Sequence, residues 1–140
     1  MRFWDSSALV PLVVEEPSSG ALEALVGTDP EIAAWWATAV ECASAIGRRA
    51  RMLAADEGRS TRAYQQLAEL AGGWTEVPPT ERLRDVAIRL VRVHDLRAGD
   101  ALQLAAALIA AENRPDTLEL VTLDERLADA ARREGFPVLP

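Results

Sequence analysis

The sequence contains no lysine, one cysteine and one histidine. A single cysteine cannot form an intrachain disulfide, and Cys42 with His94 cannot fill the tetrahedral shell of a cysteine-based zinc site. His94 also lacks an obvious nucleophile partner of the kind found in Ser-His-Asp or Cys-His enzymes. These shortages favour a reducing compartment and a chemistry that depends on neither thiolate nor imidazole.

Long apolar runs are missing as well. No stretch reaches the length of a membrane span, and the N-terminus lacks the basic, apolar and small-residue order of a signal peptide. We therefore expect a cytoplasmic protein with no membrane partner. With 140 residues, of which 49% are hydrophobic, the chain has the profile of one globular domain over residues 1–140.

The balance of charge is acidic, with 22 Asp and Glu against 15 basic residues, all of them Arg, and a net charge of −7. A general nucleic-acid binder is basic, because phosphate contacts supply most of its affinity. Any nucleic acid must therefore be held locally, by arginines or by bound cations. The densest basic region comprises Arg48, Arg49, Arg51, Arg59 and Arg62. It is interpreted either as a contact for RNA or a partner protein, or as an ordinary solvated surface.

Short apolar stretches alternate with segments of helical periodicity. Strands are expected at 2–4, 31–36, 74–77, 118–122 and 136–139, and helices at about 8–14, 21–26, 38–54, 59–71, 83–91, 101–111 and 124–134. Thr80 is expected to cap the fifth helix and Gly135 to end the last. This alternation predicts an α/β fold, a single-domain three-layer α/β/α sandwich with a mainly parallel central sheet.

The stretch 101–111 is almost entirely apolar, and Gln103 is its only polar residue. A helix that is apolar on every side must be buried on every side. Asp100 stands at the mouth of this helix, where it would either cap the helix or serve a site.

Three other acids fall at comparable places: Asp5 ends the first strand, Glu41 begins the helix after the second, and Asp124 follows the fourth expected strand. The carboxyl ends of parallel strands meet at one edge of a sheet, where ligands bind. Clustered carboxylates repel one another unless a cation lies between them, and oxygen donors suit Mg²⁺ or Mn²⁺. The pattern thus predicts a metal site.

Each acid also has an ordinary structural explanation. Asp5 and Asp124 would cap their helices, with Arg126 a further partner for Asp124, and Glu41 would complete a capping box with Thr38. Asp116 is an alternative fourth acid, although its Asn-Arg-Pro-Asp context is typical of a turn.

Four motifs lie in register along the whole chain: WDSSAL at 4–9, VECASAIGR at 40–48, HDLRAGDALQLAAA at 94–107 and VTLDERL at 121–127. Together they resemble PIN-domain proteins, particularly VapC-type ribonuclease toxins of type II toxin–antitoxin systems. The resemblance implies a metal-dependent endoribonuclease that cuts single-stranded or loop RNA and leaves a 5′-phosphate. It also implies a homodimer and a cognate antitoxin that covers the cleft, in a toxin–antitoxin hetero-oligomer.

Carried over by position, the resemblance makes Asp5, Glu41, Asp100 and Asp124 the catalytic metal ligands for Mg²⁺ or Mn²⁺. Ser6 would hold a ligand or phosphate, and Thr122 would orient the loop of the fourth acid. Arg97, just ahead of Asp100, is a candidate contact for the scissile phosphate, or else a solvated loop residue.

Three rival functions remain open at this point. A phosphoryl-accepting enzyme or receiver commonly uses a lysine, which this chain lacks. A non-catalytic PIN-like binding module would be expected to have lost an acid. A PIN-type RNA-processing nuclease without an antitoxin usually carries an extra domain.

Overall fold

The structure is a computed structural model that describes residues 1–52 and 57–140. Its centre is a five-stranded, all-parallel sheet of order β3-β2-β1-β4-β5. The strands are short: β1 (Arg2–Trp4), β2 (Ile32–Trp35), β3 (Thr75–Val77), β4 (Leu120–Val121) and β5 (Val138–Leu139). The predicted parallel α/β architecture is thereby confirmed. The last two strands are shorter than expected, because pairing begins only at Leu120 and Val138.

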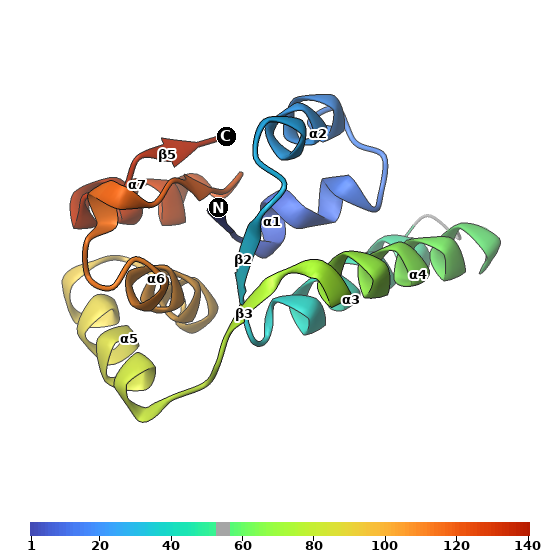
Figure 1. The fold of residues 1–140 in the computed structure, drawn as a ribbon. Helices are drawn as coiled ribbons and strands as arrows, with labels where there is room; N and C mark the ends of the chain where they lie inside the picture. Colours follow the sequence, from blue (N-terminus) through green and yellow to red (C-terminus); the bar gives the residue numbers. More distant parts are fainter. Residues whose placement is uncertain (53–56) are drawn as a thin grey trace.

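Helices connect every pair of strands along the chain (Figure 1). They are α1 (Ser6–Leu9), the 3₁₀ turn η1 (Val10–Leu12), α2 (Ser19–Thr28), α3 (Thr38–Met52), α4 (Glu57–Gly73), α5 (Glu81–Val93), α6 (Ala98–Ala110), η2 (Pro115–Thr117) and α7 (Glu125–Glu134). The helix expected at 8–14 is divided into α1 and η1. The predicted end of α3 near Ala54 lies outside the described residues.

Each face of the sheet has its own apolar core, because neighbouring side chains of a strand point to opposite faces. Phe3, Ala33 and Leu120 pack with α5, α6 and α7 on one face. Trp4 and Val121 pack with α1, α2, α3 and α4 on the other. The fold is therefore the three-layer sandwich that the sequence predicts.

The two adjacent tryptophans follow the same alternation. Trp35 is buried in the core beneath α5 and α6, whereas Trp36 is 52% exposed. Most of α6 is buried, including Gln103, which is 1% exposed. Its apolar composition thus correctly predicted a helix enclosed by the fold. Among residues 1–52 and 57–140, no helix has the length and apolar content that a membrane span requires.

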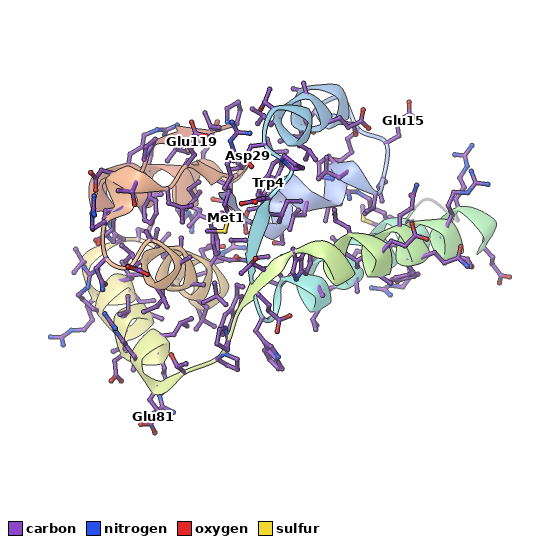
Figure 2. The ribbon with its side chains drawn as sticks, in the orientation of Figure 1. Met1, Trp4, Glu15, Asp29, Glu81 and Glu119 are labelled. Atoms are coloured by element: carbon purple, nitrogen blue, oxygen red, sulfur yellow. The ribbon has the colours of Figure 1, made fainter. Side chains whose placement is uncertain are left out.

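Two contacts fasten the N-terminal strand at its amino end. The α-amino group of Met1 lies 2.5 Å from Asp29 Oδ2, and Arg2 Nε lies 2.6 Å from Glu119 Oε2 (Figure 2). The amino group lowers the pKa of Asp29 by hydrogen bonding to it. These contacts fix β1 at the middle of the sheet, so that its carboxyl end and Asp5 have a defined position.

On the α5–α7 side, Glu134 of α7 contacts Arg89 of α5 and His94, the C-cap of that helix. Arg89 Nη2 donates to it at 2.7 Å, and His94 Nε2 lies 2.7 Å from its other oxygen. Arg89 first and His94 next lower the pKa of Glu134 against the opposing effect of burial. His94 is thus a structural residue, as expected.

Glu134→Gln should lower the free energy of unfolding by about 1 kcal/mol at neutral pH, a value discounted for the exposure of Arg89. The pKa of Glu134 is lowered in the folded state. Its contribution to the free energy of unfolding is therefore present above pH 4.5, its ordinary pKa, and is lost as the pH falls through the lowered pKa. Urea unfolding at neutral and acidic pH measures both effects. Asp129→Asn, which breaks an exposed pair with Arg132, should change stability little at either pH; equal losses for both variants would contradict the account.

Candidate active site

Asp5 follows the central strand β1 and is 5% exposed. Its carboxylate caps α1: Oδ2 accepts the backbone N–H of Ser7 at 3.1 Å and the Ser7 hydroxyl at 2.5 Å. The Thr122 hydroxyl donates to the same oxygen at 3.0 Å. Oδ1, by contrast, accepts only a long 3.3 Å bond from Ser6 within the described residues. One oxygen of Asp5 is therefore anchored while the other retains most of its capacity as a ligand.

Ser7 and Thr122 bridge the point where the strand order reverses, between β1 and β4. Open α/β sheets bind ligands at such a switch point. Their hydroxyls lie 3.2 Å apart, and Ser7 Oγ also accepts the backbone N–H of Leu123 at 2.9 Å. The β1–α1 turn is thereby tied to the loop that carries Asp124. The role of Ser6 in holding a ligand or phosphate stays a prediction. The bridging role of Ser7 was not predicted, because only the path of the turn shows which serine faces β4.

Ser7→Ala should lower the free energy of unfolding by about 1–2 kcal/mol, because it leaves the Leu123 N–H without its acceptor and removes a donor to buried Asp5. Ser6→Ala should cost less, since its hydroxyl makes the 3.3 Å bond to Asp5. Urea unfolding of the two variants is the direct comparison. A larger loss for Ser6→Ala would show that this hydrogen-bond assignment is wrong.

Glu41 lies in the first turn of α3 and is held by Gln103 of α6. Gln103 Nε2 donates to Glu41 Oε2 at 2.7 Å and to Thr38 Oγ1 at 3.1 Å. The expected capping box is wrong: Glu41 N–H donates to the carbonyl of Ala37, and Thr38 is already inside the helix, with its hydroxyl turned to Gln103. Gln103, noted in the sequence only as the polar exception in an apolar helix, connects the two helices that bear Glu41 and Asp100.

Asp100 is the third residue of α6, whose N-cap is Arg97. The backbone of Arg97 hydrogen-bonds to its carboxylate, so Asp100 assists the start of the helix without occupying the cap position. Asp124 is the N-cap of α7: Oδ1 accepts the N–H of Leu127 at 2.8 Å, and its own N–H donates to Thr122. The capping alternative for Asp124 is therefore correct, and it leaves Oδ2 uncommitted within the described residues.

The carboxylates of the site act on one another electrostatically. Burial raises the pKa of Glu41, and the charges of Asp5 and Asp100 raise it further against hydrogen bonds from Gln103 and Ser6. Burial likewise raises the pKa of Asp100, followed by the charges of Asp124 and Asp5. Arg97 opposes this rise only in part. Each group acts on the next, so the four carboxylates share one region of negative potential.

The same region surrounds Cys42. Burial raises the pKa of its thiol to about 12, with smaller contributions from Asp5 and Glu41. Cys42 is therefore a buried thiol that stays protonated at neutral pH.

An open cleft of about 730 Å³, here called the acidic cleft, lies between α1, α3 and the start of α6. It is lined by Ser6, Ser7, Val10, Glu16, Val40, Glu41, Ser44, Ala45, Arg48, Arg49, Gly99, Asp100 and Leu123. Asp5 is buried at the end of β1 beside it. Asp124 borders a separate cavity of about 400 Å³ against α7 and β5.

The donor set fits a hard divalent cation in kind, because it consists of carboxylate and hydroxyl oxygens. Burial first, and the charges of neighbouring carboxylates next, raise the pKa of Glu41 and of Asp100. In the part of the chain that the structure describes, however, no three His, Cys, Asp or Glu side chains are grouped closely enough to hold one ion. Mg²⁺ retains several waters and is commonly bound through one or two carboxylates. The ligand roles of Asp5, Glu41, Asp100 and Asp124 therefore stay a prediction.

The PIN domain family model matches residues 2–133. The chain belongs to the PIN domain family. Its fold is similar to that of a toxin–antitoxin complex chain from Klebsiella pneumoniae, at 18% identity and a TM-score of 0.69, over 100% of this chain and 97% of that one. It is also similar to VapC20 of Mycobacterium tuberculosis, described as a sarcin–ricin loop cleaving toxin, at 18% identity and a TM-score of 0.70 over 100% of both chains.

A third similar structure is FitAcB from Neisseria gonorrhoeae, at 15% identity and a TM-score of 0.66, over 100% of this chain and 97% of that one. No curated protein sequence matches this chain. At these identities the neighbours establish the PIN fold. The family and the fold support a nuclease-type site at the carboxyl edge of the sheet.

Proposed function

We propose that this PIN protein is an endoribonuclease toxin that depends on Mg²⁺ or Mn²⁺ and is restrained by a cognate antitoxin. The observation that carries the proposal is the mutual electrostatic action of Asp5, Glu41, Asp100 and Asp124 at the switch point of a parallel sheet. A site that raises the pKa of its own carboxylates is suited to binding a cation.

In the proposed mechanism, Asp5 and Asp100 would hold the cation, and Glu41 and Asp124 would complete the site from α3 and α7. Ser7 and Thr122 hold the Asp5 carboxylate in a fixed position, because both hydroxyls donate to its Oδ2. Gln103 fixes Glu41 in the same way. The bound cation supplies Lewis acidity toward the phosphate and the leaving 3′-oxygen. Arg97, exposed at the mouth of α6, is placed to approach a phosphate of the RNA.

The proposed partners extend to an antitoxin and a second copy of the chain. The toxin–antitoxin complex from Klebsiella pneumoniae contains a chain of nearly this length and fold, which supports a single-domain toxin with an antitoxin partner. Exposed Trp36 is an apolar side chain that a partner subunit would cover in a homodimer.

Cleavage of a mixed pool of single-stranded RNA tests the function. We expect cleavage with Mg²⁺ or Mn²⁺ and none after chelation by EDTA, with 5′-phosphate ends on the products. Undiminished cleavage in EDTA would contradict the metal-dependent mechanism. The nuclease assignment would be contradicted if the protein cleaved no RNA, from the pool or from cells, with any divalent ion.

A further inference from the structure

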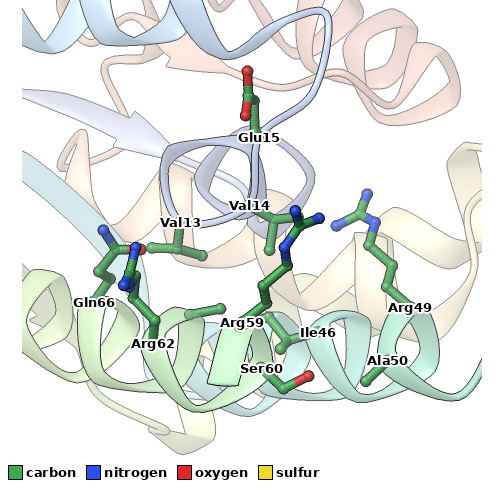
Figure 3. Close-up of a pocket in the computed structure, with 11 residues that line it drawn as sticks. Val13, Val14, Glu15, Ile46, Arg49, Ala50, Arg59, Ser60, Arg62 and Gln66 are labelled. Atoms are coloured by element: carbon green, nitrogen blue, oxygen red, sulfur yellow. The ribbon is translucent and has the colours of Figure 1, made fainter. Parts of the chain in front are cut away.

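A second groove lies alongside the acidic cleft, between the segment that follows η1 and the α3–α4 pair. It has a volume of about 490 Å³, an apolar floor that includes Val13, Val14 and Ile46, and three arginines, Arg49, Arg59 and Arg62. Figure 3 shows the side chains of Arg59 and Arg62 rising from α4, and that of Arg49 from α3, toward the segment with Val13 and Val14. We call it the arginine groove.

We propose that the arginine groove binds backbone phosphates of single-stranded RNA and guides the strand to the acidic cleft. This inference rests on the nuclease function proposed above and assigns a path to its substrate. It is also consistent with the net charge of −7, because a chain this acidic must hold RNA locally, and a group of arginines is one way to do so.

The charges lining the groove favour an anionic ligand. Among the residues that the structure describes, Glu15 is the only acidic side chain in the lining, against three arginines. Within residues 1–52 and 57–140, Arg59 and Arg62 make no ion pair. Guanidinium groups without a carboxylate partner are free to contact phosphate, which they bind with planar, paired donors.

Arg49 connects the groove to the acidic cleft, because it lines both. It lies two helical turns beyond Glu41 on α3, about 12 Å along the helix axis. Arg49 is ion-paired with Glu16, yet its buried Nη1 has no hydrogen-bond partner in the described structure. The Arg49 side chain is nevertheless 38% exposed, so its guanidinium remains within reach of a ligand at the junction of the two cavities.

The lining also indicates how the RNA would be recognised. Within residues 1–52 and 57–140, no aromatic side chain on which a base could stack lines the arginine groove. The contacts should therefore be made to phosphates, and binding through them should be insensitive to sequence and strongly dependent on salt. An acidic peptide is the competing ligand for such a groove. Continuity with the acidic cleft through Arg49 favours RNA.

The test compares two double variants. One carries Arg59→Gln and Arg62→Gln, and the matched control carries Arg92→Gln and Arg133→Gln. Both remove two positive charges, and Arg92 and Arg133 are exposed on α5 and α7, on the other face of the sheet. Binding of labelled single-stranded RNA is measured in EDTA across a salt series, so that no metal-dependent cleavage occurs. Thermal unfolding checks that both variants are folded.

We expect the Arg59/Arg62 variant to bind RNA about tenfold more weakly and to lose about 1.4 from its salt slope, near 0.7 per phosphate contact on a single strand. The control should keep the affinity and slope of the wild type. Equal losses in both variants, no loss in either, or a wild type without measurable RNA binding would each overturn the proposal.

Cleavage measured in parallel separates this inference from the proposed function. Intact cleavage with an unaltered RNA affinity in the Arg59/Arg62 variant would refute the groove and leave the nuclease standing. Selective loss of RNA binding in a chain that cleaves no RNA would support the groove and refute the nuclease.

Discussion

Asp100→Asn should reduce RNA cleavage by about three orders of magnitude, because it would remove one charged oxygen ligand of the proposed cation and leave the fold intact. Burial and the charges of Asp124 and Asp5 raise the pKa of Asp100, so its ionised form is held at a cost to the folded state. The amide removes that repulsion. The thermal midpoint of Asp100→Asn should therefore equal or exceed that of the wild type.

Asp116→Asn is the matched control, because it removes one carboxylate of the same type from the exposed turn η2. It should cleave RNA at the wild-type rate. Gel-based cleavage with Mn²⁺ and thermal unfolding measure the two effects together. An Asp100→Asn variant that remains active, or that loses activity because it unfolds, would contradict the assigned role. An inactive Asp116→Asn variant would make Asp116 a candidate acid again.

Gln103→Met should reduce cleavage by about 10- to 100-fold through loss of the hydrogen bond that orients Glu41, an effect of the size known for residues that support metal ligands. Methionine keeps the volume of this buried position while removing the donor to Glu41 Oε2. Because that hydrogen bond lowers the pKa of Glu41, its loss should raise the pKa further. Activity should then begin at a higher pH than in the wild type.

Thr38→Val separates positioning from packing in this network. The Thr38 hydroxyl contacts Gln103 but makes no bond to Glu41, so the variant perturbs the same buried cluster and leaves the Glu41 contact in place. We expect a smaller loss of activity and no shift of the pH profile. A pH profile for Gln103→Met that coincides with the wild type would show that Gln103 has only a packing role.

Local signals in the sequence predicted most of the fold. Thr80 caps α5 through the N–H of Leu83, and Gly135 ends α7 with φ of 100°, a conformation that glycine adopts freely. Both signals involve neighbours in the chain. The alternation of Phe3 and Trp4 between the two cores follows from the period of a strand.

The misjudged features depend on contacts between distant segments. Thr38 has the spacing of a capping box with Glu41, but a donor from Gln103, 65 positions away, determines where its hydroxyl points. The sequence alone does not show which of the neighbouring serines, Ser6 or Ser7, faces β4. The pairing of β1 with β4 brings Ser7 to Thr122. The ion pair of Arg49 with Glu16 likewise arises because α3 packs beside η1.

The most direct test of the central claim is a crystal structure determined with Mn²⁺, using its anomalous scattering to locate the ion. The account predicts a peak at the carboxyl end of β1, with Asp5 Oδ1 and oxygens of at least two of Glu41, Asp100 and Asp124 at about 2.1 Å or bridged by water. A fully occupied crystal with Mn²⁺ bound only elsewhere, or with these carboxylates turned apart, would contradict it.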